Sequence, residues 1–238
     1  TRITYSNGAG ELGRIDYGHD PAGRREEVSG SWARLSLPQP MGAGTYDAAN
    51  RLTARGGNAY AHDDNGNLTS DGARSFSWNA RGQLTAITGG PTPASFAYDA
   101  LGRRRQASLG GVATTFRYDA DNAIVETRGS ASVRILSALG PDSALARTDA
   151  SGTQSLLTDA LGSTIALADA AGAPVSDYAY EPFGRPSASG APSDNRIQFT
   201  GREWDGTGLQ YSRARYYNPE PGRFISEDPI GFAGGDTN

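Results

Sequence analysis

The reactive side chains of this 238-residue chain are of few kinds. All 22 basic residues are arginine, and cysteine is absent. Without lysine, the chain has no P-loop lysine, no Schiff-base chemistry and no Ser-Lys catalysis. Without cysteine, it has no disulfide, no thiolate metal site and no cysteine nucleophile. The remaining chemistry depends on carboxylates, guanidinium groups, hydroxyls and two histidines.

Two short motifs resemble ligand-binding loops, but each lacks essential parts. Gly8, Gly10 and Gly13 match the spacing of a dinucleotide fingerprint, yet no convincing strand precedes them and no helix follows. The run from Asp63 to Asn67 lacks the Asp-x-Asp-x-Asp-Gly spacing and the distal glutamate of a calcium loop. We therefore predict no cofactor and no metal site.

The histidines and the C-terminal arginines have plain structural interpretations. His19 and His62 occupy positions at which a repeated phrase carries aromatic residues, and no nucleophile motif supports a Ser-His-Asp triad. The net charge is -4, and acids interrupt the C-terminal arginines, so we expect ion pairs and solvated strand faces and no nucleic-acid patch. The arginines of this group are Arg196, Arg202, Arg213, Arg215 and Arg223.

A recurrent phrase indicates the elements that position these side chains. It consists of an aromatic residue, an acid or amide, two variable residues, a glycine or asparagine, and a following residue that is often polar or arginine. Successive copies lie about 16 to 22 residues apart, a spacing that suits a β-hairpin, and a decayed copy is expected near Leu139–Gly140. The clearest copies begin at Tyr46, His62, Trp78, Tyr98 and Tyr118, and degenerate ones begin at His19, Thr158 and Tyr180.

The residue order within the phrase predicts strand, turn and strand. Phe96 and Tyr98 alternate before their acid, so both lie on one face of a strand. Asp99 then suits a turn, because its carboxylate can bond the backbone two residues on, and Gly102 supplies a positive φ. We therefore predict an all-β fold, an array of antiparallel hairpins that buries an aromatic face. Irregular stretches at 29–45, 88–95 and 186–195 are expected to be loops.

The chain carries no recognisable targeting segment. No apolar run approaches the roughly 18 residues of a membrane span, so none is predicted. No signal pattern opens the chain, and Thr1 stands where an initiator methionine would. We expect a part of a longer polypeptide.

The C-terminal segment closely resembles a known family. The resemblance rests on Asn195–Asp205, Thr207–Pro219 and Gly222–Gly235, which are similar to the RHS-repeat-associated core of bacterial Rhs and YD-repeat proteins. The upstream Tyr-Asp phrases resemble the YD repeats of the same family, which includes the C component of Tc toxins. The resemblance covers nearly the whole chain, although residues 1–45 match only loosely.

The resemblance implies an architecture and a domain order. In the family, YD repeats form a spiralling ribbon of antiparallel hairpins that closes into a hollow shell around a C-terminal toxin. We accordingly expect β-hairpin repeats over residues 1–190. The core segment is expected over 191–238, as a plug truncated before the family's second Asp-Pro-x-Gly phrase.

The resemblance also implies a self-cleavage site. In the family the core acts as an aspartyl protease on its own chain, and two of its residues carry over as Arg215 and Asp228. The third, an aspartate of the second Asp-Pro-x-Gly phrase, has no counterpart before Asn238. Because aspartyl proteolysis needs two carboxylates, we expect this chain not to cleave itself. Arg215 and Asp228 could equally be a structural pair that supports the plug.

Three functions follow as hypotheses. The first is a structural encapsulation module of a bacterial Rhs-type effector, secreted or delivered into target cells, whose partner is a toxin domain of the same polypeptide. A secretion spike of type VI secretion or a toxin pore would deliver it. The second is the self-cleaving aspartyl protease, completed by a carboxylate missing here. The third is a surface adhesin or glycan-binding repeat protein, which requires exposed aromatic stripes.

Overall fold

The computed structural model describes residues 1–234, and the described chain is built almost entirely from β-strands, as predicted. Two short 3-10 helices, η1 (Phe199–Gly201) and η2 (Gly231–Gly234), accompany the strands. In the described part of the chain, no helix has the length and apolar character needed to cross a lipid bilayer. The chain forms two compact units. The first contains residues 1–38, 118–125 and 131–203, and the second contains 39–117, 126–130 and the residues from Trp204 onward.

Fourteen strands follow one another in a single sheet, and their order in the sheet is their order in the chain. This arrangement confirms the predicted array of antiparallel hairpins. The strands are β7 (Ala61–His62), β8 (Leu68–Ser70), β9 (Arg74–Trp78), β10 (Leu84–Gly89), β11 (Ala94–Tyr98), β12 (Arg104–Leu109), β13 (Val112–Asp119), β14 (Asn122–Arg128), β15 (Ala131–Ser137), β16 (Ala144–Asp149), β17 (Gly152–Thr158), β18 (Thr164–Ala168), β19 (Pro174–Tyr180) and β20 (Pro186–Gly190).

Three smaller sheets complete the described fold. The first is β1 (Arg2–Asn7), β2 (Gly10–His19) and β3 (Arg25–Ser29), the second is β4 (Gly44–Tyr46), β5 (Leu52–Arg55) and β6 (Asn58–Ala59), and the C-terminal one is β21 (Glu203–Trp204), β22 (Gln210–Ser212), β23 (Arg215–Asn218) and β24 (Arg223–Phe224).

The acid of the repeated phrase closes a turn in the way the phrase predicts. At Asp99, the N–H of Gly102 donates to the Asp99 carbonyl at 3.0 Å, and Gly102 has φ +84°. The Asp99 Oδ1 atom accepts the N–H groups of Leu101 and Arg103, and Oδ2 accepts Nε of Arg103 at 2.8 Å. The arginine at the end of the phrase thus neutralises the turn carboxylate.

The same turn recurs along both units. In each, the residue three positions after the acid or amide donates its N–H to that residue's carbonyl and has positive φ. At the 47–51 turn Asn50 takes the place of glycine, with φ +58°. Other turns of this kind begin at Asp20, Asp63, Asn79, Asp159, Asp169, Glu181, Gln198 and Asp228.

Two of the expected copies turn differently, and one was missed. Asp119 is the last residue of β13, and a two-residue turn leads from it directly into β14. Near Gly140 the chain forms a longer hairpin loop, in which the Ala138 N–H donates to the Ser143 carbonyl. The missed copy begins at Asp169, which follows an alanine instead of an aromatic residue. The 186–195 stretch, expected to be a loop, begins with β20, which pairs with β19.

A β-bulge follows the Asp99 turn and sets the face on which the next side chains lie. Tyr98 pairs with Arg104 and Ala97 pairs with Gln106, so Arg105 is the extra residue of the bulge. Opposed residues of an antiparallel pair share a face, so Arg104 lies on the Tyr98 side of the sheet. The three consecutive arginines therefore separate: Arg103 closes its turn, Arg104 is buried and Arg105 is exposed.

The aromatic residues line one face of the sheet, as the alternation predicts. Phe76, Phe96 and Phe116 are buried. The polar aromatic residue directly before the turn bonds to a neighbouring strand: the Tyr98 hydroxyl donates to the Leu84 carbonyl at 2.7 Å, and Trp78 Nε1 donates to the Leu68 carbonyl at 2.8 Å. The pKa of Tyr98 is raised to about 12, and burial is the largest cause.

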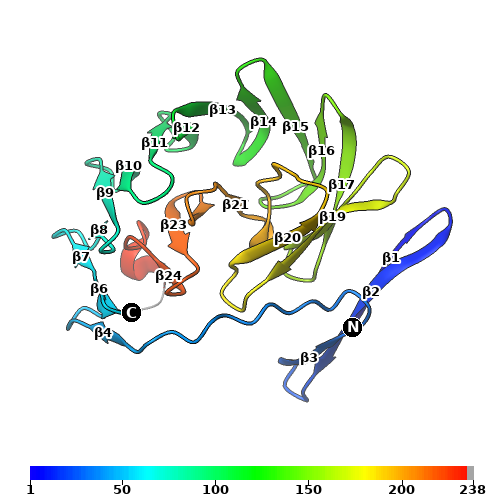
Figure 1. The fold of residues 1–238 in the computed structure, drawn as a ribbon, viewed down its shortest axis with the longest axis horizontal. Coiled ribbons are helices and arrows are strands. Elements are labelled where there is room, and N and C mark those ends of the chain that lie inside the picture. The colour runs from blue at the N-terminus through cyan, green and yellow to red at the C-terminus, as the bar shows by residue number, and fades with distance from the viewer. Residues whose placement is uncertain (235–238) are drawn as a thin grey trace. The chain divides into compact units, whose positions relative to one another are not determined.

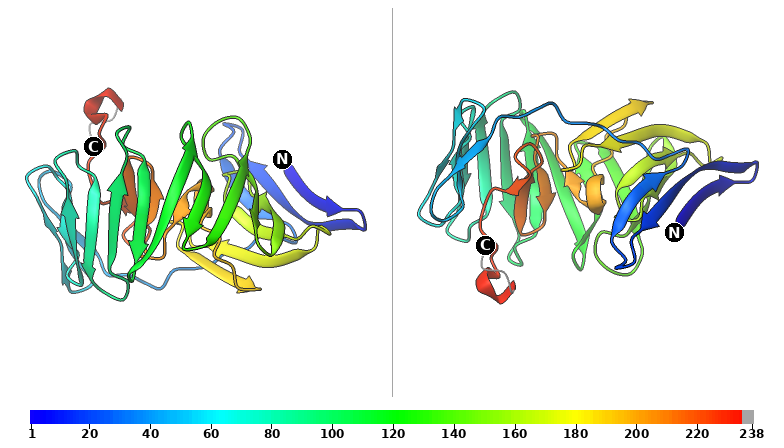
Figure 2. Two further views of the ribbon diagram at one scale, coloured as in Figure 1. Left: turned by 90° about the horizontal axis from the view of Figure 1, so that it is seen from above. Right: turned by 90° about the horizontal axis from the view of Figure 1, so that it is seen from below.

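In the second unit, the C-terminal strands cover the aromatic face. Figure 1 shows β23 on the inner side of the curved row of strands β7–β12, and Figure 2 shows the strands of this row side by side. The Phe96 and Tyr216 rings lie 5.1 Å apart between their centroids. Leu209, Tyr211, Tyr216 and Ile225 are buried here, so the core of this unit forms between the sheet and the C-terminal segment.

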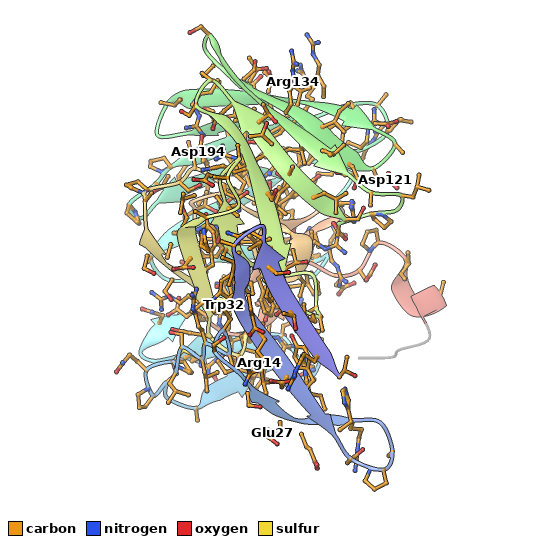
Figure 3. All side chains as sticks on the ribbon, turned by 90° about the vertical axis from the view of Figure 1, so that its right-hand side faces the viewer. Arg14, Glu27, Trp32, Asp121, Arg134 and Asp194 are labelled. Atoms are coloured by element: carbon orange, nitrogen blue, oxygen red, sulfur yellow. The ribbon has the colours of Figure 1, made fainter. Side chains whose placement is uncertain are left out.

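In the first unit, the β1–β2 hairpin packs against β18. Tyr5, Trp32 and Ile165 belong to one buried cluster, in which the Tyr5 and Trp32 rings stack with centroids 4.8 Å apart. The Trp32 N–H donates to the Arg14 carbonyl at 3.0 Å, and both residues are labelled in Figure 3. Gly13 is required at this point, because a Cβ atom there would overlap the Trp32 indole.

Candidate functional site in the C-terminal core

Arg215 and Asp228, the two residues assigned to self-cleavage, lie together in the second unit. Arg215 begins β23, and Asp228 follows β24 in the chain. The Arg215 Nη2 atom is 2.5 Å from Asp228 Oδ2, and both side chains are partly exposed. The guanidinium also lies over the Phe224 ring, 3.7 Å from its centroid. The predicted pairing is therefore present, and an aromatic ring fixes the plane of the guanidinium.

The Asp-Pro-x-Gly phrase orients the Asp228 carboxylate through its own turn. The Oδ1 atom accepts the N–H of Ile230 at 3.1 Å, and the Asp228 carbonyl accepts the N–H of Gly231 at 2.8 Å. One carboxylate oxygen thus holds the turn while the other binds Arg215. A carboxylate oriented in this way, at a partly exposed place, can act as one member of an acid–base pair in hydrolysis.

Repeats far upstream hold the segment that carries Asp228. The Leu68 N–H donates to the Ile225 carbonyl at 2.8 Å, and the Ile225 N–H donates to the Tyr216 carbonyl at 3.0 Å. Arg223 Nη2 donates to the Asn50 carbonyl at 2.6 Å. These bonds attach β24 and the following Ile225 to β8, to β23 and to the 47–51 turn. The position of Asp228 therefore depends on the first repeats of the large sheet and on the turn before them.

Among the described residues of this unit, Arg104 is the most buried charged one, and no local pattern singles it out. Its side chain and that of Asp205 are both fully buried, with Nη1 3.0 Å from Asp205 Oδ2. The same Nη1 donates to the Tyr216 hydroxyl at 2.9 Å. The Arg104 N–H donates to the Tyr211 hydroxyl at 3.2 Å. Burial raises the pKa of Tyr216 well above its usual value, so this hydroxyl remains protonated.

Four aromatic rings surround the Arg104 guanidinium. The nearest is Tyr211, whose ring centroid is 3.9 Å from Cζ. Two rings belong to the sheet and two to the C-terminal segment, so Arg104 lies where the two meet. The other three rings, at 5.2 to 5.8 Å, are those of Phe116, Phe96 and Tyr216.

A second arginine of the sheet binds the same C-terminal turn. Arg74 Nη1 donates to the Thr207 carbonyl at 2.8 Å. Arg74 is itself oriented by Asp71, with Nη2 2.7 Å from Oδ2, and by the Phe76 ring, 5.2 Å away. Within the turn, Thr207 Oγ1 donates to Asp205 Oδ1 at 2.6 Å, so both oxygens of Asp205 are used.

The preceding part of the core segment packs in the first unit. Thr164 Oγ1 donates to the Ile197 carbonyl at 2.7 Å. Arg202 Nη1 is 3.0 Å from Asp142 Oδ2. The Phe199 ring lies 5.4 Å from that of Tyr180, and a Cβ atom at Gly184 would overlap Phe199. The core segment is therefore anchored separately in each unit by an arginine–aspartate pair.

The other sequence motifs serve the strands and turns. Gly8 and Gly10 belong to the β1–β2 hairpin, which is not the loop-to-helix geometry of a dinucleotide site. The Asp63 carboxylate accepts the N–H groups of Asn65 and Asn67 inside its own turn. His62 is half-buried, and this burial, followed by the charge of Arg51, lowers its pKa.

Comparison with known proteins identifies the fold and the family. Residues 37–233 match the Teneurin YD-shell family. The tRNA3(Ser)-specific nuclease WapA of Bacillus spizizenii is 33% identical over 233 residues, which are 94% of this chain and 10% of WapA. The double-stranded DNA deaminase toxin A of Burkholderia cenocepacia is 27% identical, over 96% of this chain and 20% of the toxin.

A solved structure has the same fold. The crystal structure of TcdB2-TccC3-TEV matches with a TM-score of 0.64 and 18% identity, over 96% of this chain and 16% of that one. The chain spans about a tenth to a fifth of the curated relatives named above. The repeated turns, the hairpin sheet and these matches agree, and the chain belongs to the Teneurin YD-shell family.

Proposed function

We propose that this chain is part of the wall of a protein shell that encloses a toxin domain of the same polypeptide. The observation that carries the proposal is the C-terminal core segment packed on the aromatic face of the hairpin sheet. Hydrogen bonds between successive strands leave no easy gap in such a wall, and the two faces differ in chemistry. The carboxylates of the repeated phrases accept backbone hydrogen bonds within their own turns. Such a structural use of the acids fits a wall better than a catalyst.

The relatives support a role that does not depend on one cargo. A tRNA nuclease and a double-stranded DNA deaminase toxin each contain a stretch similar to nearly this whole chain. Their named activities differ, while the shared stretch is a small part of each. We infer that the shared stretch encloses a toxin domain that lies elsewhere in the same polypeptide. We also infer that the polypeptide is bacterial and is secreted, or delivered by a secretion spike or a toxin pore.

Protease protection of the toxin domain in the full-length parent protein tests the proposal. Ala107 is fully buried in the sheet and Gln106, its neighbour on β12, is partly exposed. Ala107→Arg and Gln106→Arg therefore add the same charge and the same trypsin site to opposite faces. We expect the toxin domain to survive trypsin in the wild type and in Gln106→Arg, and to be digested in Ala107→Arg. Digestion in the wild type as fast as that of the isolated toxin domain would contradict the shell.

A second function, self-cleavage by an aspartyl protease mechanism, is favoured by the Arg215–Asp228 pair. One carboxylate takes a proton from water, the water oxygen bonds to the scissile carbonyl carbon, and the C–N bond breaks as the nitrogen receives a proton. Asp228 would be one carboxylate, oriented by Arg215, and a segment outside residues 1–234 would supply the other.

Mass spectrometry of the full-length parent protein tests this function. We expect a defined cut in the wild type that disappears in Asp228→Asn and in Arg215→Gln. Asp99→Asn is the matched control, because Asp99 is also a partly exposed turn aspartate paired with an arginine. A cut that persists in Asp228→Asn rules out Asp228 as the catalytic carboxylate.

The adhesin hypothesis receives no support from the aromatic stripe. Phe96 and Phe116 are each only 6% exposed, so a sugar cannot stack on them. The Tyr98 hydroxyl is used within the sheet, where it bonds to the Leu84 carbonyl.

A further inference from the structure

We propose that Arg74 and Arg104 form a recognition site on the inner face of the sheet for one segment of the chain, the turn and strands from Asp205 to Tyr216. Arg104 is the anchor, and the segment supplies the carboxylate and the two tyrosines that receive it. This recognition between the C-terminal core and the sheet involves neither the toxin nor self-cleavage.

The two partners contribute matching halves of one site. The sheet supplies the guanidinium of Arg104 between Phe96 and Phe116. The segment supplies Asp205, which accepts from Arg104, and the rings of Tyr211 and Tyr216 on the guanidinium. In the packed site, removal of either charge would leave the other as a buried, unpaired charge, so each half requires the other.

The Arg74 contact sets the orientation of the turn. Its guanidinium donates to the Thr207 carbonyl two residues from Asp205, and Asp71 holds the same guanidinium from the other side. The Asp205 carboxylate also accepts the Thr207 hydroxyl. The turn is thus bound at its backbone by one arginine and at its side chain by the other. A shift of one residue would break both contacts.

The charge pair makes binding selective. A buried ion pair contributes little net stability, but removal of one partner leaves an uncompensated charge and is strongly destabilising. Apolar packing alone would accept the segment in several positions, because Leu209, Tyr211 and Tyr216 can each contact an apolar face. With Arg104 present, only the position that brings Asp205 to it is permitted.

Amide hydrogen exchange of the intact 238-residue chain measures whether the segment is bound. In Arg104→Gln and in Asp205→Ala, we expect residues 209–217 to exchange on the order of a hundredfold faster than in the wild type. Strands β9–β11 and β17–β19 should keep their protection. Arg103→Gln is the matched control, since its ion pair with Asp99 is partly exposed and closes a turn. It should leave residues 209–217 protected.

A double-mutant cycle separates charge recognition from loss of packing. The cycle compares the wild type with Arg104→Met, with Asp205→Asn and with the double variant. Arg104→Met keeps an apolar side chain but leaves the Asp205 charge uncompensated, whereas the double variant removes both charges and keeps an acceptor for Thr207. We expect the double variant to exchange at least about tenfold more slowly at residues 209–217 than Arg104→Met alone.

Three outcomes would overturn the proposal. The first is unchanged protection of residues 209–217 in Arg104→Gln. The second is equal loss of protection in β9–β11, which would show that Arg104 maintains the sheet and does not bind the segment. The third is an additive double variant, which would show that Arg104 and Asp205 do not recognise each other.

Discussion

The Arg215 guanidinium contacts both the Asp228 carboxylate, with Nη2 2.5 Å from Oδ2, and the Phe224 ring, with Cζ 3.7 Å from the ring centroid. The Arg215–Asp228 pair is partly exposed, whereas the Arg104–Asp205 pair of the same unit is excluded from solvent. The two pairs have the same chemistry but different surroundings. Their contributions to stability should therefore differ.

Removal of the Asp228 charge should change stability little. A partly exposed ion pair contributes at most about 1 kcal/mol, and in Asp228→Asn the Oδ1 atom can still accept the Ile230 N–H. We expect a free energy of unfolding within about 1 kcal/mol of the wild type, measured by urea denaturation of the 238-residue chain. A larger loss would show that Asp228 is a structural residue, and its loss could then not be used to assign catalysis.

The turn glycines should be required for their backbone conformation. Gly82 has φ +68°, and no atom lies within 4 Å of the position that a Cβ atom would take. Gly82→Ala should therefore cost about 1 to 2 kcal/mol from the backbone alone. Gly82→Asn should cost less, because Asn50 holds the same turn position with φ +58°. If urea denaturation gave equal losses in the free energy of unfolding for Gly82→Ala and Gly82→Asn, this explanation would be wrong.

Acid should destabilise the chain through its turn carboxylates. Hydrogen bonds from the Arg51 N–H and side chain lower the pKa of Asp47. At Asp99 burial is the largest single influence and raises the pKa, but the hydrogen bonds and charge of Arg103 together lower it below its usual value. Because the folded pKa lies below the unfolded value of 3.8, this stability is present above about pH 4 and is lost as the pH falls further.

Asp99→Asn tests the acid effect. Asn79 forms the same turn with an amide, so Asp99→Asn should keep the turn. Thermal unfolding between pH 2 and pH 6 should show a weaker dependence on pH in this variant than in the wild type. An unchanged dependence would assign acid sensitivity to other carboxylates.

Alkaline pH should destabilise the chain through Tyr98. Burial raises the pKa of Tyr98 from 10.0 to about 12, so its contribution is complete below pH 10 and is lost as the pH rises toward 12. Tyr98→Phe should cost about 1 kcal/mol at pH 7, because the bond to the Leu84 carbonyl is lost. It should also weaken the pH dependence of the unfolding free energy above pH 10. If the pH dependence of the unfolding free energy above pH 10 were the same in Tyr98→Phe and in the wild type, Tyr98 would not be the source of the alkaline destabilisation.

The sequence revealed the features that repeat and concealed those that depend on distant partners. The aromatic alternation and the turn acids were predictable, because each involves residues close together in the chain. The Asp169 turn was missed because Ala168 precedes it. The Asp119 copy turns early, with Ala120 at φ +47°, although Asn122 lies three residues on as Asn50 does after Asp47.

Arg104 could not be identified by local pattern. It is the middle residue of three consecutive arginines, a run that is typical of a solvated surface. Its burial results from a bulge at Arg105 and from partners about a hundred residues later. The pairing of Arg215 with Asp228, in contrast, was predicted from family resemblance, and its catalytic role stays a prediction. The division of the chain at residue 190 likewise stays a prediction.

The distance in sequence between Arg104 and Asp205 has a consequence during synthesis. The two residues are 101 positions apart. At about 5–20 residues per second, a ribosome needs roughly 5–20 s to make the stretch between them. If the sheet forms during that interval, we expect Arg104 to lie in water beside Phe96 and Phe116. A positive charge among these rings would then keep an unfinished apolar surface hydrated until the chain that will cover it has emerged.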